Sequence, residues 1–278
     1  MCIEADRIKN EERQKRLREK IARFRLFDDD FMTRVFEDDL KLTEFLLSII
    51  LQRKDLEVIE SNTQVVQKSL TGRSVKLDIK AKDKTGKLYN IEIQREDKGA
   101  DEKRARYHSA ILDTNTLLPR QDFKDLPETY VIFITEHDIF KCGLPLYHIN
   151  RKIEENGMTF CDLSHIIYVN GEYKGNDEIG DLMHDFLCAE PDEMRYKLLA
   201  EKAGKFKKTE KGAKRMCKIM EEFAAEERAD ERTTVSEEIA MNLLEEGTLS
   251  ISKIAAVSKL PESKVRELAE KLQPVANC

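Results

Sequence analysis

The alternation of hydrophobic and polar residues is clearest in two short runs of the first half of the chain. Residues 75–81 (VKLDIKA) and residues 88–94 (LYNIEIQ) both alternate with a period of two, which is typical of a strand that buries one face. Residues 83–87 (DKTGK) separate the runs and include a turn-forming Gly. The pattern therefore predicts a β-hairpin over residues 75–94.

Helical spacing and further strand-like runs surround this hairpin. Residues 30–51 predict one or two helices, and residues 101–118 predict another, with Tyr107, Ile111 and Leu112 on one buried face. Other strands are predicted at residues 56–67, 130–134, 145–149 and 165–169. The run at 130–134 (YVIFI) is typical of a strand buried on both faces. This order of elements predicts an α/β sandwich, a sheet flanked by helices.

The pattern is almost wholly helical from about residue 181 onward. A helix is predicted over residues 233–246, ending at Gly247, followed by a short helical pair at 252–257 and 261–272. The small core of that pair is expected to contain Ile254, Leu260, Val265 and Leu268. Residues 234–272 resemble a helix-turn-helix unit, but a helical hairpin used for packing or dimerisation explains the spacing equally well.

Three regions follow from these patterns. Residues 1–25 form a polar N-terminal arm, residues 26–190 form the α/β domain, and residues 191–278 form a helical C-terminal region. The chain has 278 residues, which is enough for one or two domains with a real hydrophobic core.

Composition narrows the class of protein. Charged residues make up 37% of the chain, and no stretch approaches the roughly 20 apolar residues that span a bilayer. The first 25 residues lack the apolar segment of a secretory signal, so a cytoplasmic protein is expected. The six cysteines are widely spaced without a C-x-x-C pair, so we expect free thiols and no zinc site.

Positive charge gathers in two segments of a chain whose net charge is -6. Residues 195–218 hold ten Lys or Arg and two Glu, and residues 12–25 hold seven Lys or Arg and two Glu. Residues 219–246 are the reverse, with ten acidic residues and two Arg. Basic segments fit nucleic-acid phosphates, but a solvated helix face explains each of them as well.

The polar face of the predicted hairpin carries the candidate chemistry. If Leu77 and Ile79 face the core, Asp78 points the other way, and strand pairing brings it near Glu92, with Gln94 one step further. Two close carboxylates repel each other unless a cation lies between them, and Mg²⁺ prefers such oxygen ligands. Taken alone, the alternation is explained better by an ordinary solvent-exposed strand face.

A longer resemblance favours the metal site. Thirteen residues separate Asp78 from Glu92-Ile93-Gln94, an arrangement that resembles the D-x(n)-(D/E)-x-K signature of the PD-(D/E)XK nucleases. The stretches FDDDFMTRVF, VKLDIKAKDKTGKLYNIEIQ and KRARYHSAILDT resemble the Rpn group of recombination-promoting nucleases and transposases. The resemblance covers roughly residues 27–170. It implies a restriction-endonuclease-like core with a central mixed sheet, extended by C-terminal helices.

The resemblance also implies site residues. Asp78, Glu92 and Gln94 are the expected catalytic residues, and Asp78 and Glu92 the expected ligands of Mg²⁺, for which Mn²⁺ can substitute. Relatives often add a carboxylate from the helix before the hairpin; the candidates are Glu37, Asp38, Asp39 and Glu44, of which Asp39 is chosen. Leu77 stands where the signature has Pro, and Gln94 stands where it has Lys, as in the Rpn group. Since Gln is uncharged, the metal is expected to supply most of the electrostatic stabilisation.

The expected function is that of a Mg²⁺-dependent DNA endonuclease that hydrolyses phosphodiester bonds and serves recombination or mobile elements. Arg104 and Arg106, on the helix after the hairpin, are candidates for phosphate contact or for a solvated face, whereas Tyr107 is expected in the core. DNA is the expected partner, with no membrane, and the C-terminal helices are candidates for a homodimer contact. The alternative is a DNA-binding or assembly protein with a vestigial nuclease core.

Overall fold

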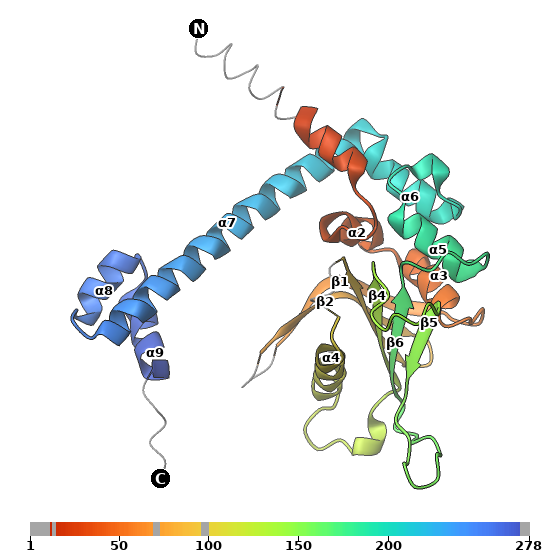
Figure 1. Ribbon diagram of the computed structural model, residues 1–278, viewed down its shortest axis with the longest axis horizontal. Helices are drawn as coiled ribbons and strands as arrows, with labels where there is room; N and C mark the ends of the chain where they lie inside the picture. Colours follow the sequence, from red (N-terminus) through yellow and green to blue (C-terminus); the bar gives the residue numbers. More distant parts are fainter. Residues whose placement is uncertain (1–11, 13–14, 69–72, 96–99, 273–278) are drawn as a thin grey trace. The chain divides into compact units, whose positions relative to one another are not determined.

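A computed structural model describes residues 12, 15–68, 73–95 and 100–272. The chain forms two compact units, residues 1–216 and residues 217–278, and the boundary falls inside one long helix, α7 (Glu210–Glu246). Figure 1 shows the helices and strands of both units. The predicted regions 1–25, 26–190 and 191–278 stay predictions.

A six-stranded mixed sheet forms the centre of the first unit. Its strands are β1 (Val58–Gln67), β2 (Val75–Asp83), β3 (Leu88–Gln94), β4 (Thr129–Thr135), β5 (Leu146–Ile149) and β6 (Ser164–Asn170). The spatial order is β1-β2-β3-β4-β6-β5. The pairs β3/β4 and β4/β6 are parallel, whereas β1/β2, β2/β3 and β5/β6 are antiparallel. The hairpin predicted over residues 75–94 is confirmed as β2 and β3.

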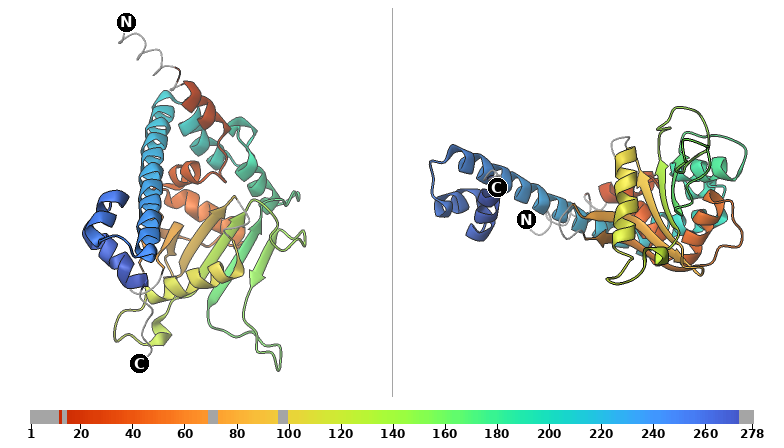
Figure 2. Two further views of the ribbon diagram at one scale, coloured as in Figure 1. Left: turned by 60° about the vertical axis from the view of Figure 1, so that its left-hand side comes forward. Right: turned by 90° about the horizontal axis from the view of Figure 1, so that it is seen from below.

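Helices cover both faces of this sheet. The helices of the first unit are α2 (Asp29–Phe36), α3 (Leu40–Ile50), α4 (Glu102–Thr114), α5 (Glu178–Leu187) and α6 (Lys197–Lys207), with residues 15–23 also helical. Figure 2 shows α4 on one face and α3 with α5 on the other. The α/β fold with a mixed sheet flanked by helices and extended by C-terminal helices is therefore confirmed.

The face under α4 has its own hydrophobic core. Ala105 and Leu112 of α4 pack against Val131 and Phe133 of β4 and against further buried residues, Leu77, Ala100 and Tyr168. Beta4 is buried throughout, apart from a partly exposed Tyr130, because parallel strands run on both sides of it and helices lie above and below. The buried strand predicted at 130–134 is confirmed.

Tyr107 is the exception on α4. Its side chain is 36% exposed, and its hydroxyl donates a hydrogen bond to the backbone carbonyl of Arg73, so the prediction of a core residue is wrong. Ile111 and Leu112 are buried as predicted. The helical period places Tyr107 near the edge of the buried stripe, where its hydroxyl reaches the Arg73 backbone instead of the core.

The second unit is a small helical bundle. Alpha8 (Ile251–Ser258) and α9 (Glu262–Leu272) pack on the end of α7, and Ile254, Val265 and Leu268 are buried there with Leu260 partly buried. The predicted core of the helical pair is confirmed. Alpha7 ends before Gly247, whose φ of 66° suits a helix C-terminus, but it begins at Glu210 rather than at residue 233. No helix in the described part of the chain is long and apolar enough to cross a membrane.

Candidate active site

The turn of the β2–β3 hairpin is held by one buried carboxylate. Asp83 accepts hydrogen bonds from the backbone NH groups of Thr85 and Lys87, from the Thr85 hydroxyl and from the Tyr89 hydroxyl. Gly86 takes a φ of 91° in this turn, a left-handed conformation that costs Gly little. The turn fixes the register of the two strands that carry the candidate residues.

Asp78 lies where the two strands stop pairing. Their ladder runs from Lys82 and Leu88 to Ile79 and Ile91, one residue short of Asp78 and Glu92. Beyond that point the Asp78 carboxylate accepts a hydrogen bond of 2.9 Å from the backbone NH of Ile93. Its side chain therefore crosses to β3, next to Glu92.

Burial and a neighbouring charge act together on Asp78. Its pKa lies well above the ordinary value of an aspartate, first because of burial and then because of the negative charge of Glu92. The hydrogen bond from Ile93 and the positive charge of Arg104 act in the opposite direction. Asp78 and Glu92 are thus close enough for their charges to oppose each other.

Glu92 is completely buried beneath α4. Its Oε2 lies 3.4 Å from the Arg104 guanidinium and its Oε1 lies 3.4 Å from Nδ1 of His108, but Oε1 has no hydrogen-bond partner. A buried carboxylate oxygen without a partner is costly unless a proton or a cation satisfies it. The solvent-exposed strand face that the alternation favoured is therefore wrong for β3, where only Gln94 is partly exposed.

Two buried side chains beside Glu92, those of His108 and Asn90, were missed by the sequence reasoning. His108 is 2% exposed, and its Nδ1 lies 3.0 Å from the amide nitrogen of Asn90. Arg104 and His108 are four residues apart on α4, so they share one helical face. That spacing inside KRARYHSAILDT is the signal that pairs them, although it does not tell which face of the helix meets the sheet.

The structure distinguishes among the carboxylates before the hairpin. Asp39 caps α3 by accepting a hydrogen bond from the backbone NH of Leu42, and it also pairs with Lys202. Glu37 pairs with Arg34 and Arg215. Glu44 accepts from the backbone NH of Val58, and Asp38 has a left-handed φ of 53°. The predicted metal role of Asp39 is untested, and its carboxylate has these other contacts.

Asp29, at the start of α2, is the carboxylate whose charge reaches the site. It is among the groups that raise the Asp78 pKa. Its Oδ1 accepts from the Gln64 amide at 3.0 Å, which ties α2 to β1. Asp29 lies within FDDDFMTRVF, but it was not among the carboxylates that the sequence offered as candidates, so the sequence reasoning missed it.

Gln94 is the last residue of β3. It lies two positions after Glu92 on the same strand, so the two side chains leave β3 on the same face. Its backbone carbonyl accepts from the NH of Glu136, which holds the strand end against the segment after β4. Gln94 is partly exposed, whereas Glu92 is buried, so solvent reaches part of this residue.

A comparison with protein-family models identifies the family of this chain. The model of the PD-(D/E)XK nuclease family transposases matches residues 34–179, just over half of the chain. The chain belongs to this family. Comparisons with curated proteins and with solved structures gave no match. The resemblance stated for residues 27–170 is confirmed at the level of the PD-(D/E)XK family, which implies a nuclease-like, hydrolytic function.

The donor set fits the divalent metal that PD-(D/E)XK nucleases generally use. Among the described residues, no group of three or more His, Cys, Asp or Glu side chains is placed so that it could hold a metal ion. Mg²⁺ does not need such a group, because it keeps several waters and binds through one or two carboxylates. Asp78 and Glu92 provide two such carboxylates, and the unpartnered Oε1 of Glu92 is the kind of atom that a cation satisfies.

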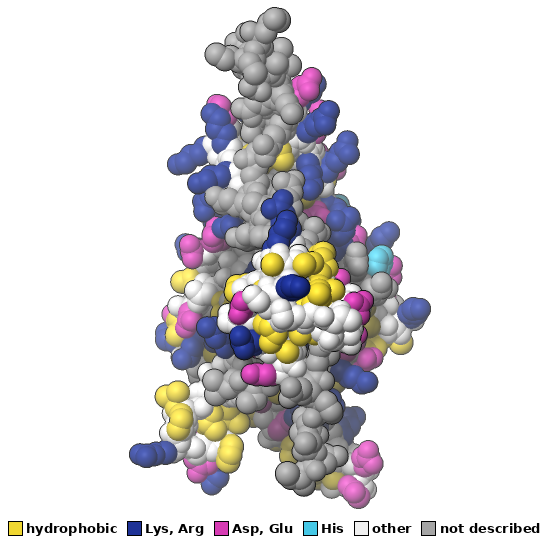
Figure 3. Space-filling view, turned by 90° about the vertical axis from the view of Figure 1, so that its left-hand side faces the viewer, with side chains coloured by type: hydrophobic (Ala, Val, Ile, Leu, Met, Phe, Trp, Pro, Cys, Tyr) yellow, Lys and Arg dark blue, Asp and Glu magenta, His cyan; other side chains and the backbone are white. Residues whose placement is uncertain are grey.

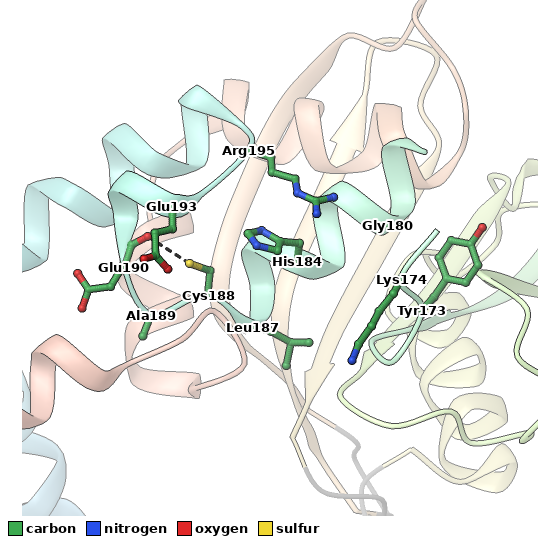
Figure 4. A pocket seen from close by; sticks show the side chains of 10 residues that line it. All are labelled: Tyr173, Lys174, Gly180, His184, Leu187, Cys188, Ala189, Glu190, Glu193 and Arg195. Atoms are coloured by element: carbon green, nitrogen blue, oxygen red, sulfur yellow. Dashed lines mark hydrogen bonds between the residues drawn. The ribbon is translucent and has the colours of Figure 1, made fainter. Parts of the chain in front are cut away.

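A different pocket of this PD-(D/E)XK protein lacks comparable chemistry. It measures about 450 Å³ and lies around the end of α5, where Cys188 and His184 face it (Figure 4). Burial raises the pKa of the Cys188 thiol, and its Sγ donates to the carbonyl of Glu190. Since a thiol with a raised pKa is a poor nucleophile, this pocket offers no catalytic cysteine.

Proposed function

We propose that the protein is a divalent-metal-dependent DNA endonuclease. The observation that carries the proposal is the convergence of Asp78 and Glu92 at the end of the β2–β3 ladder, where the negative charge of Glu92 helps to raise the pKa of Asp78. Membership of the nuclease family supports it. Mg²⁺ is the proposed physiological ion, with Mn²⁺ as a substitute, because the donors are carboxylate oxygens.

Asp78 and Glu92 are the proposed metal ligands, and Asp29 rather than Asp39 is the proposed further carboxylate, which acts on the site through its charge. Asp29 is favoured because its charge acts on Asp78, whereas Asp39 caps α3. When bound, a divalent ion stabilises charge on the phosphodiester and makes water a stronger nucleophile. Carboxylates brought together in this way are positioned before the substrate arrives, so little reorganisation is needed.

The remaining groups act on water and on the phosphate. Hydrolysis joins a water oxygen to phosphorus, breaks one P–O ester bond and delivers a proton to the leaving oxygen. The Gln94 amide can donate or accept a hydrogen bond, which suits orientation of the water or of a phosphate oxygen. Arg104 brings a positive charge to within 3.4 Å of Glu92, so a cation is present although Gln94 replaces the signature Lys.

Cleavage of a supercoiled plasmid tests the proposal. Nicked or linear product should form with Mg²⁺, should be absent with EDTA, and should be absent for Asp78→Ala at equal protein concentration. A variant Asp78→Ala that cleaves as well as the parent would show that the nuclease activity, or its assignment to this site, is wrong. A role in recombination or mobile-element movement is also proposed, and only membership of the family supports it.

A DNA-binding or assembly role without cleavage is the second candidate. The end of α7 with α8 and α9 favours packing over DNA contact, since Lys264 pairs with Glu237 and Glu267 and Arg266 pairs with Glu262. Cations that are already paired are less available to phosphates. Light scattering of the full chain addresses this role, because a strict monomer contradicts a homodimer through the C-terminal helices.

A further inference from the structure

A cationic cleft opens beside the candidate active site, between the start of β2 and the start of α4. It measures about 640 Å³. The charged residues among those that line it are Arg73, Lys76, Asp101, Lys103 and Arg104. Four of them are Lys or Arg and one is acidic, so the cleft carries a local excess of positive charge in a chain of net charge -6.

The acidic residue of the cleft is already engaged. Asp101 caps α4, and its Oδ1 accepts from the backbone NH groups of Lys103 and Arg104 at 3.0 Å each. Its carboxylate therefore partly serves the helix rather than neutralising the cations. Lys103 and Arg104 lie in the first turn of α4, where the helix dipole disfavours positive charge. Positive charges in the first turn make a helix less stable, so stabilisation of α4 does not explain why Lys103 and Arg104 are cations.

Three of the four cations of this cleft have no ion-pair partner among the described residues. Arg73, Lys76 and Lys103 are exposed, and within the described part of the chain no carboxylate forms an ion pair with any of them. Arg104 alone pairs with an acid, Glu92, and lies within reach of both the cleft and the site. An anion that entered the cleft would be attracted by several unneutralised charges at once.

The other basic surface of the first unit is organised differently. Figure 3 shows Lys and Arg side chains gathered in its upper half, over helical residues 15–23 and the start of α7. Four cations of residues 202–215, from α6 to the start of α7, are already paired: Lys202 with Asp39, Lys208 with Asp192, Lys214 with Glu210 and Arg215 with Glu37. Lys207 donates to the carbonyls of Ala22, Phe24 and Ala189, so it joins chain segments together.

We infer that the cleft between β2 and α4 binds the sugar-phosphate backbone of nucleic acid and leads it to Asp78 and Glu92. This inference rests on the proposed function, because it names the substrate surface of the same site. Arg73, Lys76 and Lys103 contact phosphates that are not cleaved. Arg104 lies at the inner end of the cleft, where it passes from its contact with Glu92 to the phosphate nearest the carboxylates.

The test measures binding without cleavage. A short fluorescein-labelled DNA duplex is titrated with the full chain in EDTA over a series of salt concentrations, and fluorescence anisotropy gives the binding constant. Each phosphate contact contributes about -0.9 to the slope of log K against log salt. Arg73→Gln, Lys76→Gln and Lys103→Gln should each make the slope shallower by about one, and the triple variant by about three.

Two matched controls keep the result specific. Lys54→Gln removes an exposed cation that lies three residues before Glu57, whose carbonyl accepts from the backbone NH of Lys84 at the turn end of the hairpin. Lys211→Gln removes an exposed cation from the other basic surface. Both should keep the parent slope. Thermal unfolding of every variant should match the parent, since these side chains are exposed.

The outcomes separate the cleft from the catalytic proposal. Cleft variants that keep the parent slope, or a parent protein whose binding does not depend on salt, overturn the inference. A slope that becomes shallower in Lys211→Gln but not in the cleft variants overturns it as well. If the cleft variants lose slope but the parent does not cleave plasmid with Mg²⁺, the cleft stands and the nuclease proposal is wrong.

Discussion

The Asp78 carboxylate accepts a hydrogen bond from the backbone NH of Ile93 at the point where β2 and β3 stop pairing. The Asp78 side chain, rather than a backbone carbonyl of β2, is thus the hydrogen-bond acceptor for this NH group of β3. This contact sets Asp78 beside Glu92 and compensates part of the cost of burying a carboxylate. Metal binding and cleavage, as proposed, depend on this arrangement.

Metal binding should be visible without any substrate. A ligand that binds only the folded state stabilises it by about 2.7 kcal/mol at one hundred times its Kd, which corresponds to a rise in Tm of roughly 5–10 °C for a domain of this size. Mg²⁺ should therefore raise the Tm of the parent but not of Asp78→Asn. In EDTA, Asp78→Asn should be at least as stable as the parent, because it removes one of two opposed charges. An equal Mg²⁺ response in both proteins would contradict the assignment of Asp78 as a ligand.

Asp29 and Asp39 should respond differently to the same change. Asp29→Asn should reduce both plasmid cleavage and the Mg²⁺-dependent rise in Tm. Asp39→Asn should leave both near the parent level, because Asn is as good an N-cap as Asp. Asp39→Ala should lower the free energy of unfolding by about 1 kcal/mol through loss of the cap. If Asp39→Asn abolishes the Mg²⁺-dependent rise in Tm while Asp29→Asn keeps it, Asp39 acts on the metal site, as predicted from the sequence, and Asp29 does not.

Gln94 should matter for the rate of cleavage more than for metal binding. Gln94→Ala should lower the cleavage rate by about 10²-fold, since a misplaced nucleophile or phosphate costs about that much. Its Mg²⁺-dependent rise in Tm should stay near that of the parent. Gln94→Lys keeps a hydrogen-bond donor and should cleave faster than Gln94→Ala. Single-turnover rates at saturating Mg²⁺ measure this, and equal rates for the Ala and Lys variants would argue against a positioning role.

Asp138 should make stability depend on pH. Burial raises its pKa, but hydrogen bonds from the Tyr147 hydroxyl and from backbone NH groups of Gly143, Lys141 and Phe140 outweigh burial, so the pKa is lowered. A lowered folded-state pKa gives stability that is present above the unfolded-state pKa, about 4, and is lost as the pH falls through the folded-state value.

Urea unfolding at several pH values checks this. Asp138→Asn should be less stable than the parent at neutral pH, and the difference should shrink below about pH 4, because the parent then loses its charge as well. Glu155→Gln, which removes an exposed carboxylate, is the matched control and should follow the parent throughout. A difference between Asp138→Asn and the parent that is constant with pH would rule out this origin.

The sequence by itself determined the elements and the pair of acids. Alternation located β2 and β3, helical spacing located α3, α8 and α9, and the signature selected Asp78 and Glu92, because these patterns depend on residues close together in the chain. The family match agrees with this part of the reasoning.

Only the tertiary structure decided what surrounds that pair. Glu92 is buried because α4 packs over β3 and brings Arg104 and His108 to it, and no local pattern states which face a following helix covers. Likewise, Asp29 rather than Asp39 acts on Asp78, because α2 meets β1 through Gln64. Charges and burial act across space, so their effects depend on contacts between residues that are far apart in the sequence.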